Sequence, residues 1–544
     1  MRYPRTLALA GTAVLYVLLG PVVVLAVALA LAVPRSRRRL WGWLRPTRRV
    51  VAGWAGAVAL LVAIPVLAPD GWFPIPLGPG ALVTPAYVGR AVREQPISLE
   101  VPQHPGLAPN GRSAMHNDAW STDAYAGPGP TGDSPEVDTA WYGVEECATL
   151  AVDEHGRLVA LCGDLGGPTL HVIDPDTMRP LATKELPERG DTGSRPWEDL
   201  CGGSYFYLDA EDRAVLATTD RRILVVATDD GAGDPDLTVE ESYDLSGAVP
   251  EDDCLIALVP DWEGRIWWVT RDGRVGTVTD RGASSDEPVV RSLDLDEEVA
   301  NSLATGEDGG VYVVSVEALY KLAADDRSHE PVVRWRTPYD RGTDRKPGQL
   351  SRGSGTTPTL LPDGLVAITD NADERMHVVF LRVGDGQEVC RAAVFDEGAG
   401  ATESSLVAVG GGGVVVENNH GYGGPWSTLL GRTTSGGFAR VDVAGGACEV
   451  VWTSEETAPT SVAKVSLQTG LVYAYTKRHS WWGVNAWYLT AIDARTGRTA
   501  FAVRTGLGTM FNNHYSAVTL APDGSAYVAT LTGLVRVRDR PAGD

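Results

Sequence analysis

The sequence predicts an all-β fold, an eight-bladed β-propeller, preceded by an N-terminal two-helix transmembrane hairpin. A hairpin of two apolar strands recurs at intervals of about fifty residues along most of the chain, which is typical of propeller blades. Two long apolar runs without a charged residue stand before this repeat. The 62 glycines and 35 prolines follow no collagen-like period and suit many short strands joined by turns. We therefore expect the hairpin at 1–69, a linker at 70–112 and the propeller at 113–544.

The N-terminal hairpin is predicted from the uncharged runs at residues 7–33 and 50–67. At a rise of about 1.5 Å per residue, the first run is long enough to span a bilayer, with a kink at Gly20 and Pro21. Seven arginines lie between the runs, in residues 34–49, and arginine-rich loops stay in the cytoplasm. This predicts a multi-pass protein of the cell membrane with an extracytoplasmic C-terminal domain. The alternative is a cleaved signal peptide, which would leave the arginines outside.

Residues 70–112 are rich in proline and glycine and predict an extended spacer between membrane and propeller. Residues 113–130 are polar, aromatic and rich in turn residues. His116 and Asp118 in this stretch have the chemistry of ligands, but a surface loop that leads into the first strand is the expected structure.

The repeat consists of eight hairpins, each with a turn residue that tolerates a positive φ. The flanking residues are apolar enough for strands that are buried on both faces. The turns lie at Gly156, Asp212, Gly264, Gly309, Gly364, Gly412, Gly470 and Gly524. The last repeat ends one strand short, so an earlier segment, 137–144 or 97–101, is expected to supply the missing outer strand and to hide two sheet edges.

All six cysteines lie beyond the apolar runs, which is compatible with three disulfides in an oxidising compartment. Several connectivities are open to six cysteines. The first two face each other across the first hairpin, and the others hold equivalent places in neighbouring blades. These positions favour the pairs Cys147–Cys162, Cys201–Cys254 and Cys390–Cys448.

The repeat also predicts which residues surround the channel mouth, because the first strand of a blade starts, and the second ends, on one face. In the last four blades these places carry polar side chains. The ligand-binding candidates are Thr357, Asn371, Glu403, Asn419, Lys477, Asn513 and His514. The metal candidates are Asp370, Asp373 and Glu417, because calcium prefers carboxylate oxygens. The alternative is that these side chains cap the backbone of their own turns.

One turn carries a family resemblance. Residues 493–498, DARTGR, resemble the D-x-x-T-G-K/R turn of pyrroloquinoline-quinone-like propeller repeats, which joins the two outer strands of a blade in that family. The approach AGPGP at 126–130 is similar to the entry of those proteins. The resemblance extends from residue 113 to the end and implies a membrane-anchored member of actinobacterial type. It also implies the propeller fold, a quinone cofactor in the dehydrogenases of the family, and a non-enzymatic scaffold in many others.

The formal charge of −23 argues against nucleic acid as a partner, because an acidic surface repels phosphates. No nucleophile elbow, phosphate loop or metalloprotease motif stands in a suitable context, so no catalytic residue is predicted. We therefore expect a membrane-anchored extracytoplasmic scaffold that binds a ligand, a protein or a glycan of the cell envelope. The alternative is a quinone- and calcium-dependent oxidoreductase-like enzyme that uses the channel mouth of the last four blades.

Overall fold

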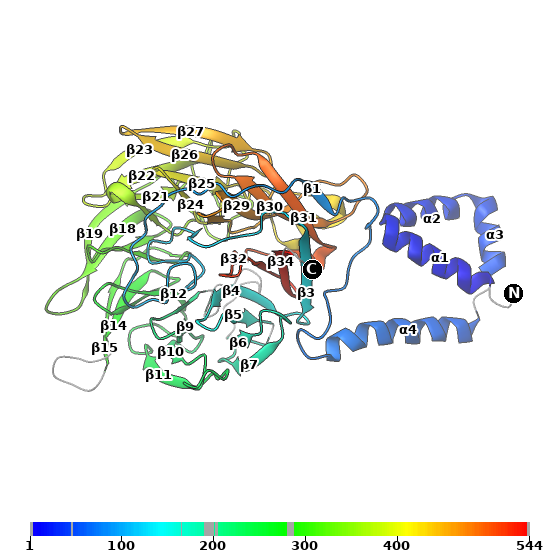
Figure 1. Cartoon of the computed structure of the whole chain (residues 1–544), viewed down its shortest axis with the longest axis horizontal. Coiled ribbons are helices and arrows are strands. Elements are labelled where there is room, and N and C mark those ends of the chain that lie inside the picture. Colours follow the sequence, from blue (N-terminus) through cyan, green and yellow to red (C-terminus); the bar gives the residue numbers. More distant parts are fainter. Residues whose placement is uncertain are drawn as a thin grey trace.

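The computed structural model describes residues 4–44, 47–164, 166–189, 201, 205–279 and 288–540. Their strands form eight sheets arranged in a ring around a central channel, with the helices to one side (Figure 1). The predicted eight-bladed all-β propeller is therefore confirmed.

Blades 1 to 4 each contain four strands that pair in chain order, and the first strands face the channel. Blade 1 contains β4 (Glu146–Val152), β5 (Leu158–Gly163), β6 (Pro168–Ile173) and β7 (Pro180–Glu185). Blade 2 contains β8 (Phe206–Leu208), β9 (Ala214–Ala217), β10 (Arg222–Val226) and β11 (Val239–Asp244). Blade 3 contains β12 (Leu255–Pro260), β13 (Ile266–Thr270), β14 (Arg274–Thr279) and β15 (Val289–Asp294). Blade 4 contains β16 (Ala304–Thr305), β17 (Val311–Val314), β18 (Ala318–Ala324) and β19 (Pro331–Pro338).

Blades 5 and 6 follow the same plan. Blade 5 contains β20 (Thr359–Leu361), the short helix η1 (Pro362–Gly364), β21 (Leu365–Thr369), β22 (His377–Arg382) and β23 (Glu388–Ala393). Blade 6 contains β24 (Val407–Gly410), β25 (Gly413–Glu417), the short helix η2 (Pro425–Gly431), β26 (Phe438–Ala444) and β27 (Ala447–Ser454).

Blade 7 gains two strands from the N-terminal part of the chain. Its own strands are β28 (Lys464–Ser466), β29 (Leu471–Lys477), β30 (Ala486–Asp493) and β31 (Thr499–Leu507). β1 (Tyr87–Gly89) pairs antiparallel with the outer strand, and β2 (Ala124–Tyr125) pairs parallel with the inner strand.

Blade 8 closes the ring with strands from both parts of the chain. The short helix η3 (Thr509–Phe511) precedes β32 (Val518–Leu520), β33 (Ala526–Thr530) and β34 (Gly533–Asp539). β3 (Pro135–Trp141) adds the outer strand, in antiparallel register from Pro135 opposite Asp539 to Trp141 opposite Gly533. The missing strand thus comes from the first of the two predicted segments, and both edges are paired.

The burial of the strands follows their distance from the channel. The inner strands, such as β5 and β29, are almost entirely apolar and buried on both faces. The outer strand β7 instead alternates between half-buried and exposed residues, because only one of its faces meets a neighbouring blade. In blade 5 both Asp363 and Gly364 adopt a positive φ, as the Pro-Asp-Gly turn requires.

All three predicted disulfides are present. Cys147 and Cys162 are directly opposite each other on β4 and β5. Cys201 and Cys254 precede the first strands of blades 2 and 3. Cys390 and Cys448 join the outer strands β23 and β27 of neighbouring blades.

The N-terminal apolar region differs from the single span expected at residues 7–33. It is divided into α1 (Pro4–Leu19) and α2 (Val22–Ala32), which lie side by side (Figure 1). Gly20 adopts a φ of +79° and Pro21 supplies no amide proton, so the first helix ends at this point. α3 (Pro34–Leu44) makes much of the arginine-rich segment helical, and α4 (Arg48–Leu67) contains the second run. Among the helices that the structure describes, none combines the length and apolarity needed to cross a membrane.

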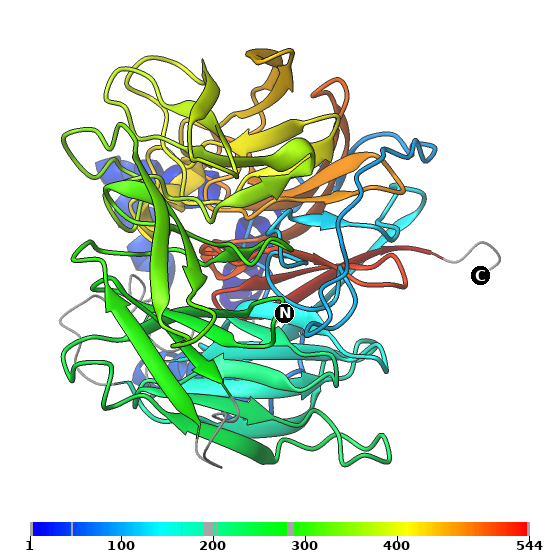
Figure 2. The same cartoon turned by 90° about the vertical axis from the view of Figure 1, so that its left-hand side faces the viewer.

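The segment expected to be an extended spacer makes backbone contacts with the propeller along part of its length. The backbone N–H of Gln95 donates to Thr469 O at 3.1 Å, and that of Ile97 donates to Leu467 O at 2.8 Å. Further along, the His104 ring contacts Trp262 with 4.7 Å between centroids. These contacts are made with the hairpin turns of blades 7 and 3, so residues 95–104 of the linker lie on the face of the ring opposite the predicted mouth. Figure 2 shows this linker on one face and the helices displaced toward the other.

The expectation of a surface loop at 113–130 is wrong. Residues 112–125, here called the channel segment, lie inside the ring, and most of their side chains from Ser113 onward are buried. Successive parts of the segment bond to the inner strands of blades 1, 2, 4, 5, 6 and 7. The backbone bonds join Val152 to Arg112, Leu208 to Ser113, Thr305 to Ala119, Leu360 to Trp120, Ala408 to Thr122 and Val465 to Asp123. The polar residues of this segment predicted exposure to water. In the structure the strand edges around the channel supply the hydrogen bonds that water would otherwise make.

Replacing Cys390 and Cys448 by serine tests the link between blades 5 and 6. Both residues are only partly buried, so the substitution itself costs little, but the cross-link between residues 58 apart is lost. We expect the free energy of unfolding to fall by about 2–4 kcal/mol in chemical denaturation. The single variant Cys448→Ser should lose the same amount, and an unchanged midpoint in both variants would contradict the prediction.

Candidate functional site at the channel mouth

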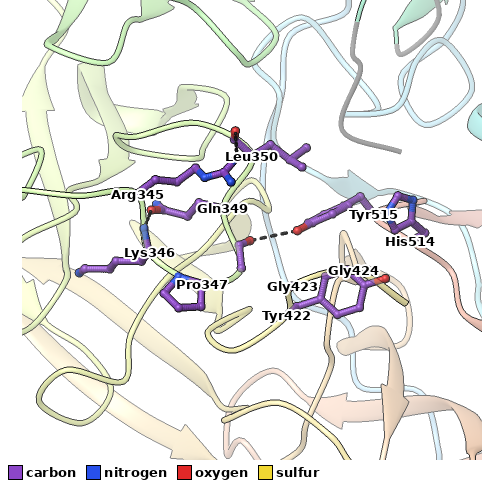
Figure 3. A pocket seen from close by; sticks show the side chains of 11 residues that line it. Arg345, Lys346, Pro347, Gln349, Leu350, Tyr422, Gly423, Gly424, His514 and Tyr515 are labelled. Atoms are coloured by element: carbon purple, nitrogen blue, oxygen red, sulfur yellow. Dashed lines mark hydrogen bonds between the residues drawn. The ribbon is translucent and has the colours of Figure 1, made fainter. Parts of the chain in front are cut away.

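A pocket of about 180 Å³ lies at the predicted channel mouth and is here called the mouth pocket (Figure 3). Three separate connections line it. Residues 345–350 lie between β19 and β20, residues 422–424 follow β25, and residues 514–515 lie between β31 and β32. The pocket is thus assembled from blades 4 to 8, which are adjacent in the ring but far apart in sequence.

Tyrosines hold the walls of the mouth pocket. The Tyr515 hydroxyl donates to Gly348 O at 3.1 Å, across the gap that Figure 3 shows between the two connections. Tyr422 meets Tyr515 edge-on, with 5.5 Å between ring centroids, and its hydroxyl donates to Asn512 Oδ1 at 3.3 Å. The backbone N–H of Lys346 donates to Gln349 Oε1 at 3.0 Å, which closes a turn inside the first connection. The walls are therefore fixed before a ligand arrives.

The charged groups of the pocket are mainly cationic. Burial lowers the pKa of Lys346, whose ammonium group donates to Ala372 O at 2.5 Å. Arg345 supplies a guanidinium that donates to Leu350 O at 3.0 Å. His514 Nδ1 lies 3.4 Å from Glu146 Oε2. Cations, phenol rings and glycine backbone suit a small anionic or hydroxyl-rich group, and a volume below about 300 Å³ is small for a whole cofactor.

Glu403, one of the ligand candidates, lies next to the mouth pocket. Its Oε2 accepts from the backbone N–H of Leu350, a pocket residue, at 3.0 Å. Its Oε1 is buried without a hydrogen-bond partner among the described residues. Burial raises the pKa of Glu403 from its usual 4.5 to about 8, so the carboxyl is largely neutral at pH 7. The carboxyl thus supports the connection 345–350 instead of offering a charge to a ligand.

His514 is the one predicted candidate that lines this pocket; most of the others join blades to each other. Asn419 Nδ2 donates to Pro459 O of the next blade at 3.2 Å. Asn513 Oδ1 accepts from the Thr460 hydroxyl at 3.1 Å, again between blades. Lys477 Nζ donates to Arg432 O, and burial lowers the pKa of Lys477 to about 8. These side chains satisfy backbone and polar groups where the blades crowd at the channel.

The remaining two ligand candidates contact chain connections. Asn371 Nδ2 donates to Arg341 O at 3.0 Å, in the long connection between β19 and β20. Thr357 Oγ1 lies 3.2 Å from Nε2 of His116 in the channel segment. Both are buried, so they contact other parts of the chain and do not face solvent.

The three metal candidates do not meet at one point. Asp370 Oδ2 lies 2.8 Å from His377 Nδ1. Asp373 Oδ1 accepts from the backbone N–H of Thr343 at 3.0 Å. Glu417 Oε1 accepts from Asn419 Nδ2 at 2.6 Å, and burial raises the pKa of Glu417 well above its usual value.

Two other groups bring metal-ligand atoms together in the described part of the chain, and neither contains these three carboxylates. One consists of Glu145, Cys162 and His171, but its cysteine is in a disulfide. The other, Glu154, His155 and Asp229, is largely exposed and lies beside a guanidinium, 3.8 Å from the aspartate. The observed positions thus do not fit a calcium–quinone centre built from the predicted carboxylates.

A buried ionic cluster inside the channel was missed from the sequence. Lys464 of β28 and Asp123 of the channel segment form an ion pair in which both side chains are fully buried. The same carboxylate lies 3.0 Å from His116 Nδ1, and Lys464 Nζ also donates to Met115 O. Burial lowers the pKa of Lys464, and burial raises the pKa of nearby Asp118 to about 7. The sequence signals were the polar residues His116 and Asp118 before the first blade and a lysine at the start of the inner strand β28.

Comparisons with known proteins assign no family to the chain. No protein-family model matches the chain. An uncharacterized protein of Archaeoglobus fulgidus is 27% identical over 317 residues, which cover 52% of this chain and 60% of that protein. The match therefore spans less than two thirds of this relative's length.

Solved β-propeller structures are similar at low identity. A streptogramin B lyase is 9% identical, with a TM-score of 0.38, and the match covers 74% of this chain and 97% of that structure. BamB from Moraxella catarrhalis is 13% identical, with a TM-score of 0.33, and the match covers 60% and 93%. This similarity concerns the fold and assigns no activity.

Replacing Lys464 by methionine tests the channel cluster. The variant leaves Asp123 buried without its counter-ion, which should lower the free energy of unfolding by about 3–5 kcal/mol in chemical denaturation. Adding Asp123→Asn should recover part of this loss, because no unpaired charge then remains. The exposed pair Arg382–Asp385 is the control, and Arg382→Ala should cost less than about 1 kcal/mol. Equal losses for both lysine and arginine variants would contradict a special role of the buried pair.

Glu403 gives a pH dependence with a defined sign. Because its pKa is raised in the folded state, the folded protein binds the extra proton, and the stability that this supplies is lost as the pH rises from about 4.5 to about 8. We expect Glu403→Gln to unfold with a weaker dependence on pH across this range than the wild type, measured by urea denaturation at pH 5 and 8. Parallel curves for the two proteins would refute the assignment.

Proposed function

We propose that the chain is a membrane-anchored, extracytoplasmic propeller of the pyrroloquinoline-quinone-like kind that binds a ligand or protein at its mouth pocket. The observation that carries this proposal is the pocket itself. It is formed by connections from different blades, and it is lined by Arg345, His514, two tyrosines and glycine backbone. A rigid ring that presents such a pocket at one mouth fits a binding scaffold of the cell envelope.

The N-terminal helices support membrane anchoring. α2 is apolar throughout and has no buried residue, and Val24, Leu25 and Leu29 are 56%, 58% and 61% exposed. Exposed apolar surface of this kind marks an interaction with another phase or partner. The arginines of α3 directly follow, as expected of a segment held at the cytoplasmic side.

The cysteines support an extracytoplasmic propeller. All six are joined in three disulfides, which form and persist in oxidising compartments. An envelope protein or glycan is thus the proposed partner class, and the cationic pocket favours an acidic or hydroxyl-rich group on that partner.

A photo-crosslinking residue in place of Pro347 tests the proposal in intact cells. Pro347 is exposed and lines the mouth pocket. We expect a discrete adduct from the membrane fraction that weakens several-fold when Lys346→Glu and Arg345→Glu are added. The same crosslinker at Glu263, an exposed turn residue of the opposite face, is the control. Identical adducts at both positions, or none at Pro347, would rule out the pocket as the binding site.

A further inference from the structure

Five large apolar side chains are exposed on the mouth face of the propeller and are here called the apolar rim. Trp481 is 92% exposed, and the others are 40–69% exposed, namely Trp426, Leu430, Trp482 and Met510. They lie on η2, on the connection between β29 and β30, and on η3. Exposed indoles and aliphatic side chains at one place indicate an interaction surface, because isolated exposure is common but clustered exposure is costly.

The three connections that carry the rim are bonded to one another. The backbone N–H of Ser480 donates to Gly431 O at 2.8 Å, and that of Gly431 donates to Asn485 Oδ1 at 2.8 Å. Asn512 Nδ2 lies 3.4 Å from Thr428 Oγ1, which joins η3 to η2. The apolar rim is thus one continuous, hydrogen-bonded surface whose apolar side chains are exposed.

The apolar rim is continuous with the apolar surface of the N-terminal helices. A Cβ placed on Gly483 would lie 3.3 Å from Pro21, and one on Gly20 would lie 2.7 Å from Val484. The turn between α1 and α2 therefore packs directly against the connection that carries Trp481. Figure 1 shows the helices beside the edge of the ring that carries β30 and β31.

A cation also borders the rim. Arg432 is exposed, and its guanidinium donates to Trp426 O at 3.2 Å and to Leu429 O at 3.3 Å. Tryptophan beside arginine suits the boundary between acyl chains and anionic headgroups, where indoles place their rings and guanidinium groups meet phosphates. A protein partner would need a matching apolar groove, whereas a bilayer accepts these protruding loops without one.

We propose that the apolar rim rests in the interfacial layer of a lipid bilayer, so that the propeller lies mouth-down on the membrane in which its helices are anchored. The proposal rests on the membrane anchoring proposed above. Gly423 and Gly424 line the mouth pocket and directly precede η2, so the pocket would open beside the lipid headgroups. Its ligand would then be presented at the membrane surface.

The test uses the full chain reconstituted in vesicles of phosphatidylcholine and phosphatidylglycerol. All native cysteines are in disulfides, so Trp481→Cys provides a unique thiol for an environment-sensitive fluorophore. We expect nitroxide-labelled lipid to quench this fluorophore several-fold more strongly than one at Glu263→Cys on the opposite face. Equal quenching at both sites would overturn the proposal. A second result would also overturn the proposal: added envelope protein changes the emission of the fluorophore at position 481, whereas lipid does not.

Alkaline extraction separates failure of the rim from failure of the anchor. If the wild type is released from vesicles by alkaline washing, membrane anchoring fails, and the proposal for the rim fails with it. If the protein stays in the membrane but the Trp481→Cys label is not quenched, the rim proposal alone is wrong.

A second variant set measures orientation. In a chain labelled at Pro347→Cys, serine at Trp426, Trp481 and Trp482 should reduce energy transfer to a lipid dye several-fold. Serine at Leu181, Val332 and Val333, which are exposed on outer strands, should leave the transfer unchanged. Loss of transfer in both sets, or in neither, would contradict the proposed orientation.

Discussion

The fold depends on backbone hydrogen bonds between the channel segment and the inner strands of six blades. Inner strands of a propeller converge on an axis where they cannot bond to one another, and their edges need partners. Residues 112–125 supply these partners and bring buried charge with them, because Asp123 pairs with Lys464 at the axis. The segment therefore links the blades at the centre of the ring. The pairing of β3 with β34 closes the ring at its outer edge.

This arrangement decides where a ligand can bind. Residues 95–104 of the linker lie on one face and the channel segment lies inside the ring, whereas the mouth pocket lies at the other face. The mouth pocket is built there from loops, which tolerate varied residues while the strands keep the ring rigid. Glu403 supports the pocket wall, since its carboxyl group accepts from the backbone N–H of Leu350.

The sequence was sufficient for the features that repeat or alternate. Apolar hairpins at regular spacing predicted the ring, the missing strand predicted β3, and the matched positions of Cys390 and Cys448 predicted their disulfide. Strand direction predicted which residues surround the mouth, and of these candidates His514 lines the mouth pocket. What the sequence could not distinguish was a polar side chain that binds a ligand from one that satisfies a neighbouring blade. Asn513 and Asn419 occupy positions that suit either role, and only the carbonyls next to them in space decide between the two.

Ring closure by β3 also has a consequence for how the chain reaches its native state. Glu136 must find Arg538 and Arg540 across about four hundred residues, and contacts of such sequence separation form slowly. During synthesis from the N-terminus, β3 and the channel segment emerge before any blade that they will join. The channel segment can bond to blades 1, 2, 4, 5 and 6 as they emerge, but β3 has to remain unpaired until β34 of blade 8 arrives. Its strand edges are exposed to aggregation during that interval. Once the ring is closed, unfolding has to break pairs from both ends of the propeller together, so the finished domain is expected to be long-lived on kinetic grounds as well as stable.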